Sequence, residues 1–69
     1  MIVEIQPYVG ETAGKIWQVL NERGPQTLSQ IKKGLNGSGE LVGFALGWLA
    51  REDKVSIIQD RKSFKVSLK

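Results

Sequence analysis

The side chains best suited to chemistry are cations, several of them adjacent or closely spaced in the sequence. They are Lys32, Lys33, Arg51, Arg61, Lys62 and Lys65. Clustered cations of this kind neutralise nucleic-acid phosphates without reading the base sequence. We take them as candidate phosphate contacts. The simpler alternative is that each is an ordinary solvated surface charge, as any exposed helix or hairpin turn tolerates.

Catalytic chemistry finds little support in the sequence. The 69 residues include seven Asp and Glu but no Cys and no His, so the chain has neither a thiolate or imidazole zinc site nor a nucleophile paired with imidazole. The carboxylates are scattered, and no glycine-rich phosphate loop is present. We therefore expect no enzyme, no metal, no cofactor and no small-molecule ligand.

Positive charge is concentrated near the C-terminal end of the sequence. Residues 54–69 hold five basic side chains and one acidic side chain, a net charge of +4, whereas residues 1–53 hold five basic and six acidic ones, a net charge of −1. This asymmetry favours an anionic partner for the C-terminal segment, although charge of this size also keeps a small domain soluble.

A chain of this length is expected to form one small domain around one core. We assign residues 1–7 to an N-terminal arm and residues 8–69 to the domain. The longest apolar stretch, residues 41–50, is about half of what a bilayer span requires. Residues 1–9 lack the basic leader and the cleavage site of a signal peptide. The sequence therefore predicts a cytoplasmic protein with no membrane partner.

Apolar residues at helical spacing predict a first helix that begins after Gly10 and ends at Gly24, where a proline follows. Trp17 lies in its apolar stripe and is expected in the core, as is Trp48 further along the chain, and stacking on a ligand is the alternative for both. Gly14 lies inside this helix and costs about 1 kcal/mol relative to Ala. We expect it to permit close packing of another helix.

Two more helices are expected after the first. Thr27 and Gln30 form a capping-box pattern that starts a short helix directly after Thr27. Residues 36–37, Asn and Gly, end that helix. Ser38 then caps a third helix, predicted over residues 39–52.

From Val55 the period of the apolar residues changes to two, which predicts two strands joined by a polar connection over residues 59–63. Arg61 and Lys62 lie at the tip of this hairpin, and a short strand near residues 25–27 would complete a three-stranded sheet. The element order predicts an α+β winged helix-turn-helix domain, in which a three-helix bundle carries a C-terminal β-hairpin wing.

Two sequence motifs strengthen this assignment, Ala13-Gly-Lys-Ile-Trp17 and Leu46-Gly-Trp-Leu-Ala-Arg-Glu52. With them the chain resembles a small prokaryotic family of stand-alone winged-helix domains of largely uncharacterised function, over roughly residues 8–69. In winged-helix proteins generally, the third helix enters the major groove of DNA and the wing contacts phosphates. The resemblance thus implies a DNA-binding module with a role in transcription.

The predicted third helix nevertheless presents few side chains that read bases, and its single Arg lies near its end. Outside its apolar arc it presents Glu40, Gly43, Gly47 and Arg51, whereas base edges are read by Arg, Asn, Gln, Ser or Lys. The first hypothesis is therefore weak DNA binding through the basic wing, indifferent to base sequence.

The alternative hypothesis is a protein-interaction or dimerisation module without direct DNA readout. Gly43 and Gly47 form a flat strip on the third helix that another backbone can approach closely, by analogy with small-residue motifs in membranes. Glu40 and Phe44 border this strip, and Ile58 on the outward side of the hairpin could extend it. The opposing interpretation is that a deeply buried helix simply tolerates its glycines.

Overall fold

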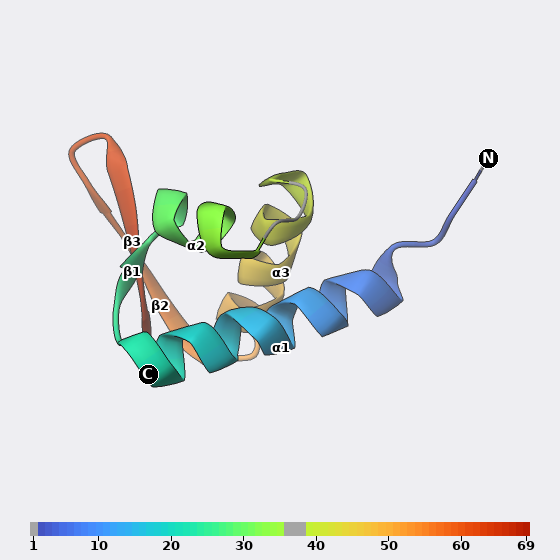
Figure 1. The fold of residues 1–69 in the computed structure, drawn as a ribbon, viewed down its shortest axis with the longest axis horizontal. Coiled ribbons are helices and arrows are strands. Elements are labelled where there is room, and N and C mark those ends of the chain that lie inside the picture. Colours follow the sequence, from blue (N-terminus) through green and yellow to red (C-terminus); the bar gives the residue numbers. More distant parts are fainter. Residues whose placement is uncertain (1, 36–38) are drawn as a thin grey trace.

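The computed structural model describes residues 2–35 and 39–69, and within them helices pack beside one small sheet (Figure 1). The elements are α1 (Gln6–Arg23), β1 (Gln26–Thr27), α2 (Leu28–Leu35), α3 (Gly39–Arg51), β2 (Val55–Asp60) and β3 (Ser63–Leu68). The sheet is antiparallel with strand order β1-β3-β2. The hairpin of β2 and β3 projects past α2 and away from α1. The predicted α+β winged helix-turn-helix fold is confirmed.

The start of α1 differs from the sequence-based expectation. The helix begins at Gln6 and not after Gly10, so only residues 2–5 of the described chain precede it. The N–H of Val9 already donates to the carbonyl of Ile5, at 2.9 Å, and the Val9 side chain is buried. A proline in the first turn is compatible with this start, because the first helical N–H groups have no partner within the helix. Burial of Val9 offsets the poor helix propensity of Gly10.

The boundary between α1 and α2 is confirmed in detail. Gly24 follows α1 with φ of 78°, and its N–H donates to the carbonyl of Leu20 at 2.9 Å. The capping box is formed, because the N–H of Gln30 donates to Oγ1 of Thr27 at 3.2 Å and the N–H of Thr27 donates to Oε1 of Gln30 at 2.9 Å. The short strand predicted near residues 25–27 is β1.

The predicted turn at residues 36–37 and the predicted cap at Ser38 lie outside the described residues. At its other end α3 stops at Arg51, one residue before the expected end. The cause is a left-handed residue, Asp53, with φ of 60°.

The hydrogen bonds at the end of α3 have the pattern of a Schellman motif. The N–H of Asp53 donates to the carbonyl of Ala50, and the N–H of Lys54 donates to the carbonyl of Leu49, each at 3.0 Å. The motif turns the chain directly into β2. The side chain of Lys69 returns to donate a hydrogen bond to the carboxylate of Asp53.

The connection between β2 and β3 is shorter than the sequence indicated. Asp60 pairs with Ser63, so the turn contains Arg61 and Lys62 alone, and the expected connection over residues 59–63 is wrong in length. Arg61 has φ of 60°, which makes the tight turn possible, because two-residue hairpin turns need a positive φ at the first central residue.

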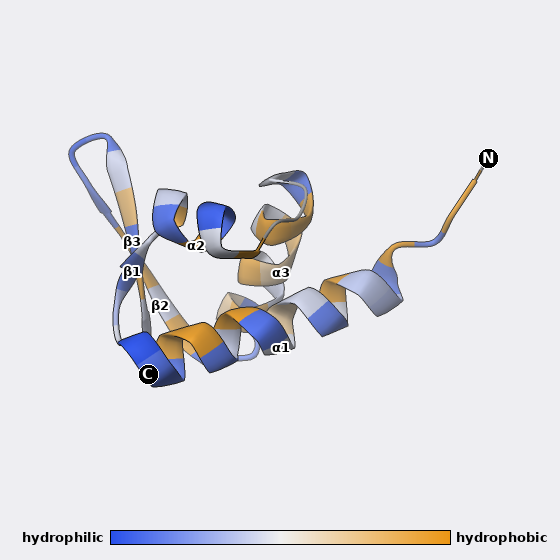
Figure 2. Ribbon diagram, viewed as in Figure 1, coloured by the Kyte–Doolittle hydropathy of each residue, from blue (hydrophilic) through white to orange (hydrophobic). Residues whose placement is uncertain are grey.

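The core lies between α1, α3 and the inner face of the sheet, and apolar side chains of all elements except β1 meet there. Figure 2 shows where hydrophobic residues occur along these helices and strands. Its buried members are Val9, Ala13, Ile16, Leu20, Ile31, Val42, Ala45, Leu46, Leu49, Val55 and Val66. Trp17 and Trp48 are not among them. Their exposed fractions are 41% and 48%, so the expectation that both anchor the core is wrong.

Among the residues that the structure describes, none packs closely against the glycines inside α1 and α3. A Cβ placed on Gly14 would meet no heavy atom within 4 Å, so the expected close helix contact at this residue is absent. The same holds for Gly43 and Gly47, both of which are exposed. The two glycines lie on the side of α3 opposite its buried residues, and whether the helix simply tolerates them stays a prediction.

Candidate nucleic-acid interface

Three of the six candidate cations lie together at the wing. Arg61, Lys62 and Lys65 line one open hollow with Thr27 and Asp60. Thr27 reaches the wing because it is the residue paired with Lys65 between β1 and β3. With Ser63, which also lines it, the hollow combines three cations, one carboxylate and two hydroxyl residues, a set that favours an anion.

A second, smaller hollow continues from the wing towards the start of α2. Lys62 also lines this hollow, together with Thr27, Ser29 and Phe64. The cation at the turn therefore faces the first residues of α2 across a gap bordered by hydroxyl groups. Backbone N–H groups at a helix start and nearby hydroxyls are common phosphate contacts.

The other three candidate cations do not join this cluster. Lys32 and Lys33 are exposed on α2, and the stem of Lys32 runs towards the start of α3, with Cε 3.5 Å from where a Cβ on Gly39 would lie. Arg51 lies at the end of α3 that leads into β2, so the length of the hairpin separates it from the turn at Arg61.

The exposed face of α3 contains the residues that the sequence assigned to it. Glu40, Gly43, Gly47 and Arg51 are all exposed, and the exposed fraction of Phe44 is 54%. The hydrogen-bonding side chains on this face are Glu40, which only accepts, and Arg51 at the C-terminal end, which only donates.

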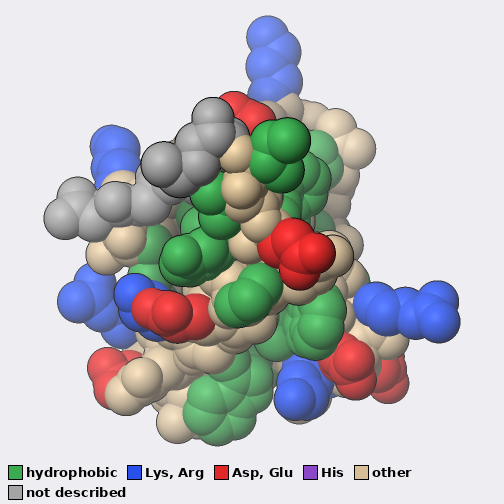
Figure 3. Space-filling view, turned by 90° about the vertical axis from the view of Figure 1, so that its right-hand side faces the viewer, with side chains coloured by type: hydrophobic (Ala, Val, Ile, Leu, Met, Phe, Trp, Pro, Cys, Tyr) green, Lys and Arg blue, Asp and Glu red, His purple; other side chains and the backbone are tan. Residues whose placement is uncertain are grey.

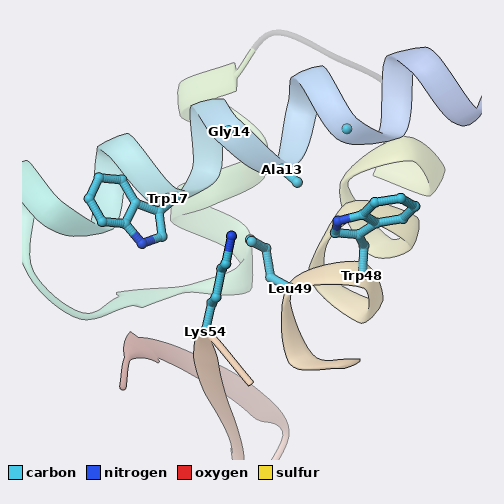
Figure 4. A pocket seen from close by; sticks show the side chains of 7 residues that line it. Ala13, Gly14, Trp17, Trp48, Leu49 and Lys54 are labelled. Carbon is cyan, nitrogen blue, oxygen red and sulfur yellow. The ribbon is translucent and has the colours of Figure 1, made fainter. Parts of the chain in front are cut away.

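Sequence reasoning missed a hollow between the two tryptophans. Trp17 of α1 and Trp48 of α3 lie on opposite sides of it, over a floor of Ala13 and Leu49, and Lys54 extends between the indoles (Figure 4). The hollow holds about 300 Å³. The helical spacing of apolar residues could not reveal this hollow. A tryptophan has the same spacing from its apolar neighbours whether it lies at the centre of the buried side of the helix or at its exposed edge.

A second apolar hollow lies near the start of α1. Ile5, directly before α1, and Tyr8 of α1 line it together with Leu41 and Phe44 of α3, and Glu40 is a further lining residue. Apolar side chains are visible over this end of the molecule, with carboxylates among them (Figure 3). Exposed aromatic and aliphatic side chains therefore border α3 along its α1 side.

The described residues were also compared with the requirements of a metal site and of a membrane-spanning helix. Among the described residues, no three His, Cys, Asp or Glu side chains are grouped so that they could hold a metal ion. In the same part of the chain, no helix has both the length and the apolarity needed to cross a membrane.

The helices, the short β1 strand and the projecting hairpin define the class of winged helix-turn-helix domains. The family model described as "Winged helix-turn-helix domain (DUF2582)" matches residues 1–68, and the chain belongs to this family. The match includes residues 1–7, which the resemblance seen in the sequence left out. The chain is also 48% identical over 64 residues to "Uncharacterized protein MJ1608" of Methanocaldococcus jannaschii, an alignment that covers 88% of this chain and 90% of the relative.

Proposed function

We propose that the protein is a non-catalytic module that binds nucleic acid weakly, through phosphate contacts made by its wing. The observation that carries the proposal is the grouping of Arg61, Lys62 and Lys65 at one hollow of a projecting hairpin. Lys32, Lys33 and Arg51 are outlying contacts that a long polyanion could reach. A role in transcription and a cytoplasmic location belong to the same proposal.

Lack of base readout is the second part of the proposal. Specific recognition depends on bidentate side chains at base edges, and the exposed face of α3 instead presents Glu40 and two glycines between its ends. A carboxylate at this position repels phosphates. Binding should therefore depend on charge and respond little to base sequence.

The test compares the protein with a charge-reversed wing. Arg61→Glu combined with Lys62→Glu should lower affinity for a labelled random-sequence DNA duplex at low salt at least about tenfold, because two contacts are lost and two repulsions are gained. Fluorescence anisotropy measures the binding. Both side chains are exposed and outside the core, so the melting temperature should be nearly unchanged.

A matched control separates local contact from overall charge. Lys15→Glu combined with Arg23→Glu makes the same change in net charge on α1, away from the wing. This control should weaken binding far less than the wing variant. Equal weakening by the two variants, or unchanged affinity of the folded wing variant, would contradict the proposal.

A protein-interaction module is the second candidate function. The observation that favours it is the exposed surface of α3, where Gly43 and Gly47 leave open space and Phe44 and Trp48 are about half exposed. Exposed apolar patches next to polar residues mark interaction sites. Measurement of oligomeric mass without DNA distinguishes this candidate from the first.

A further inference from the structure

We infer that α3 is a self-complementary surface on which a second copy of this chain packs in the antiparallel direction. The surface consists of Glu40, Gly43, Phe44, Gly47, Trp48 and Arg51, and we call it the α3 face. The inference deepens the interaction-module candidate and does not depend on nucleic-acid binding by the wing.

The first argument is the unexplained cost of two glycines. Gly43 and Gly47 each destabilise the helix by about 1 kcal/mol relative to Ala. Nothing within the described chain needs the space, because a Cβ on either residue would meet no heavy atom within 4 Å. A contact outside the chain explains both, since helix axes approach as closely as about 8 Å only where side chains at the contact are small.

The second argument is the arrangement of charge. Glu40 lies in the first turn of α3 and Arg51 in its last turn. At about 100° per residue they lie within about 20° of each other around the helix. Neither forms an ion pair with another described residue. The α3 face thus has an acidic residue at its start and a basic residue at its end. When a second copy of α3 packs in the antiparallel direction, the acidic residue of each copy lies opposite the basic residue of the other.

The third argument is the order of residues between the two charges. When Glu40 of one copy meets Arg51 of the other, the two-fold axis passes between Ala45 and Leu46. Phe44 then lies beside Trp48 of the second copy on one edge of the contact.

On the opposite edge of the same contact, Gly43 lies beside Gly47 of the second copy, and the helices can close there. The same antiparallel register therefore pairs the opposite charges, packs the aromatic side chains against each other and lets the two helix backbones approach closely. A parallel arrangement would instead bring Glu40 against Glu40.

The side chains around the α3 face fit an apolar partner of this shape. Two hollows lie between this face and α1: Ile5 and Tyr8 line one with Phe44, and Trp17 lines the other with Trp48. The contact is small compared with a standard interface of about 1,600 Å². We therefore expect a dissociation constant between about 1 µM and 1 mM.

The test uses sedimentation velocity of the full chain, without DNA, at concentrations up to about 1 mM. Glu40→Arg alone and Arg51→Glu alone should each weaken the dimer about tenfold, because two attractive contacts become repulsive. The double variant, Glu40→Arg with Arg51→Glu, should recover the parent affinity to within about threefold. Glu22→Arg on α1 is the matched control and should leave self-association almost unchanged.

Each outcome decides the inference. A parent chain that stays monomeric at about 1 mM overturns it. The proposed register is overturned if neither single variant weakens the dimer, or if the double variant does not restore it. Only antiparallel pairing places Glu40 of one copy against Arg51 of the other. Circular dichroism on the same samples shows that each variant is folded, and Phe44→Ala provides an independent disruption that leaves the charges intact.

Discussion

Thr27 lies opposite Lys65 in the pairing of β1 with β3, and the same Thr27 accepts a hydrogen bond from the N–H of Gln30 at the start of α2. One residue therefore connects the wing to the helix-turn-helix part of the fold. Its hydroxyl stabilises the helix start, and its backbone belongs to the sheet that supports the wing cations.

We predict that Thr27→Ala lowers the free energy of unfolding by about 1 kcal/mol, because one N–H at the start of α2 loses its acceptor. Urea unfolding at neutral pH measures the change. Ser29→Ala, at an exposed position of the same helix, should change stability by less than about 0.5 kcal/mol. Similar losses for both variants would show that the capping box contributes little.

The left-handed conformation of Asp53 leads to a second prediction. Asp53→Gly and Asp53→Ala both remove the carboxylate that accepts the hydrogen bond from Lys69, so they differ mainly in the Cβ. We expect the Gly variant to be more stable than the Ala variant by about 1 kcal/mol, since φ of 60° strains any residue with a Cβ. Thermal unfolding compares them, and equal stability would mean that the turn relaxes when the residue changes.

The salt dependence of DNA binding provides a third prediction. With about three to five phosphate contacts, the logarithm of the affinity for a random duplex should fall against the logarithm of the salt concentration with a slope of roughly −3 to −4.5. The Arg61→Glu, Lys62→Glu variant should have a slope less steep by about 2. Tight binding to a selected sequence that persists at physiological salt would contradict both the weak electrostatic mode and the lack of base readout.

The fourth prediction concerns Gly47→Gln. At low concentration, where the chain is monomeric, the variant should gain about 0.5 kcal/mol of helix propensity and melt a few degrees higher than the parent. At high concentration the parent should gain stability from self-association, and the variant, whose side chain blocks the α3 face, should not. Gly34→Gln on α2, another exposed glycine with open space around it, should raise the melting temperature at every concentration.

If Gly47→Gln raises the melting temperature by the same amount at all concentrations, Gly47 takes part in no contact between copies. It then only lowers the stability of α3, and the fold tolerates this. The parent's own melting temperature would then also be independent of concentration. Mass measurements on the same samples show which case applies.

Local signals in the sequence were sufficient for most of the element order. The capping box at Thr27 and the end of α1 at Gly24 depend on residues within a few positions, and both are confirmed. The start of α1 was not predictable in this way, because Gly10 weakens the local helix signal while distant side chains bury Val9. The exposure of Trp48 likewise depends on how α1 and α3 cross.

The candidate site was only partly visible in the sequence, for a related reason. The cations at the hairpin turn were identified by their positions between two alternating strands. Their grouping with Thr27 depends on the register between β1 and β3, which brings together residues far apart in the chain. The open space around Gly43 and Gly47 could not be predicted from the sequence either. Periodicity shows which residues share one face of a helix, but it does not show whether another part of the chain covers that face.

The position of β3 between β1 and β2 has a consequence for how the protein acquires its structure. β3 is the last strand in chain order, yet both ladders of the sheet pass through it, and Val66 is paired on both sides, with Gln26 and with Ile57. A fragment that stops at Asp60 would leave β1 and β2 without partners and one wall of the core open. β1 pairs only with β3, which is distant from it in the sequence. We therefore expect β1 to join the sheet late in folding, after the local β2–β3 hairpin has formed.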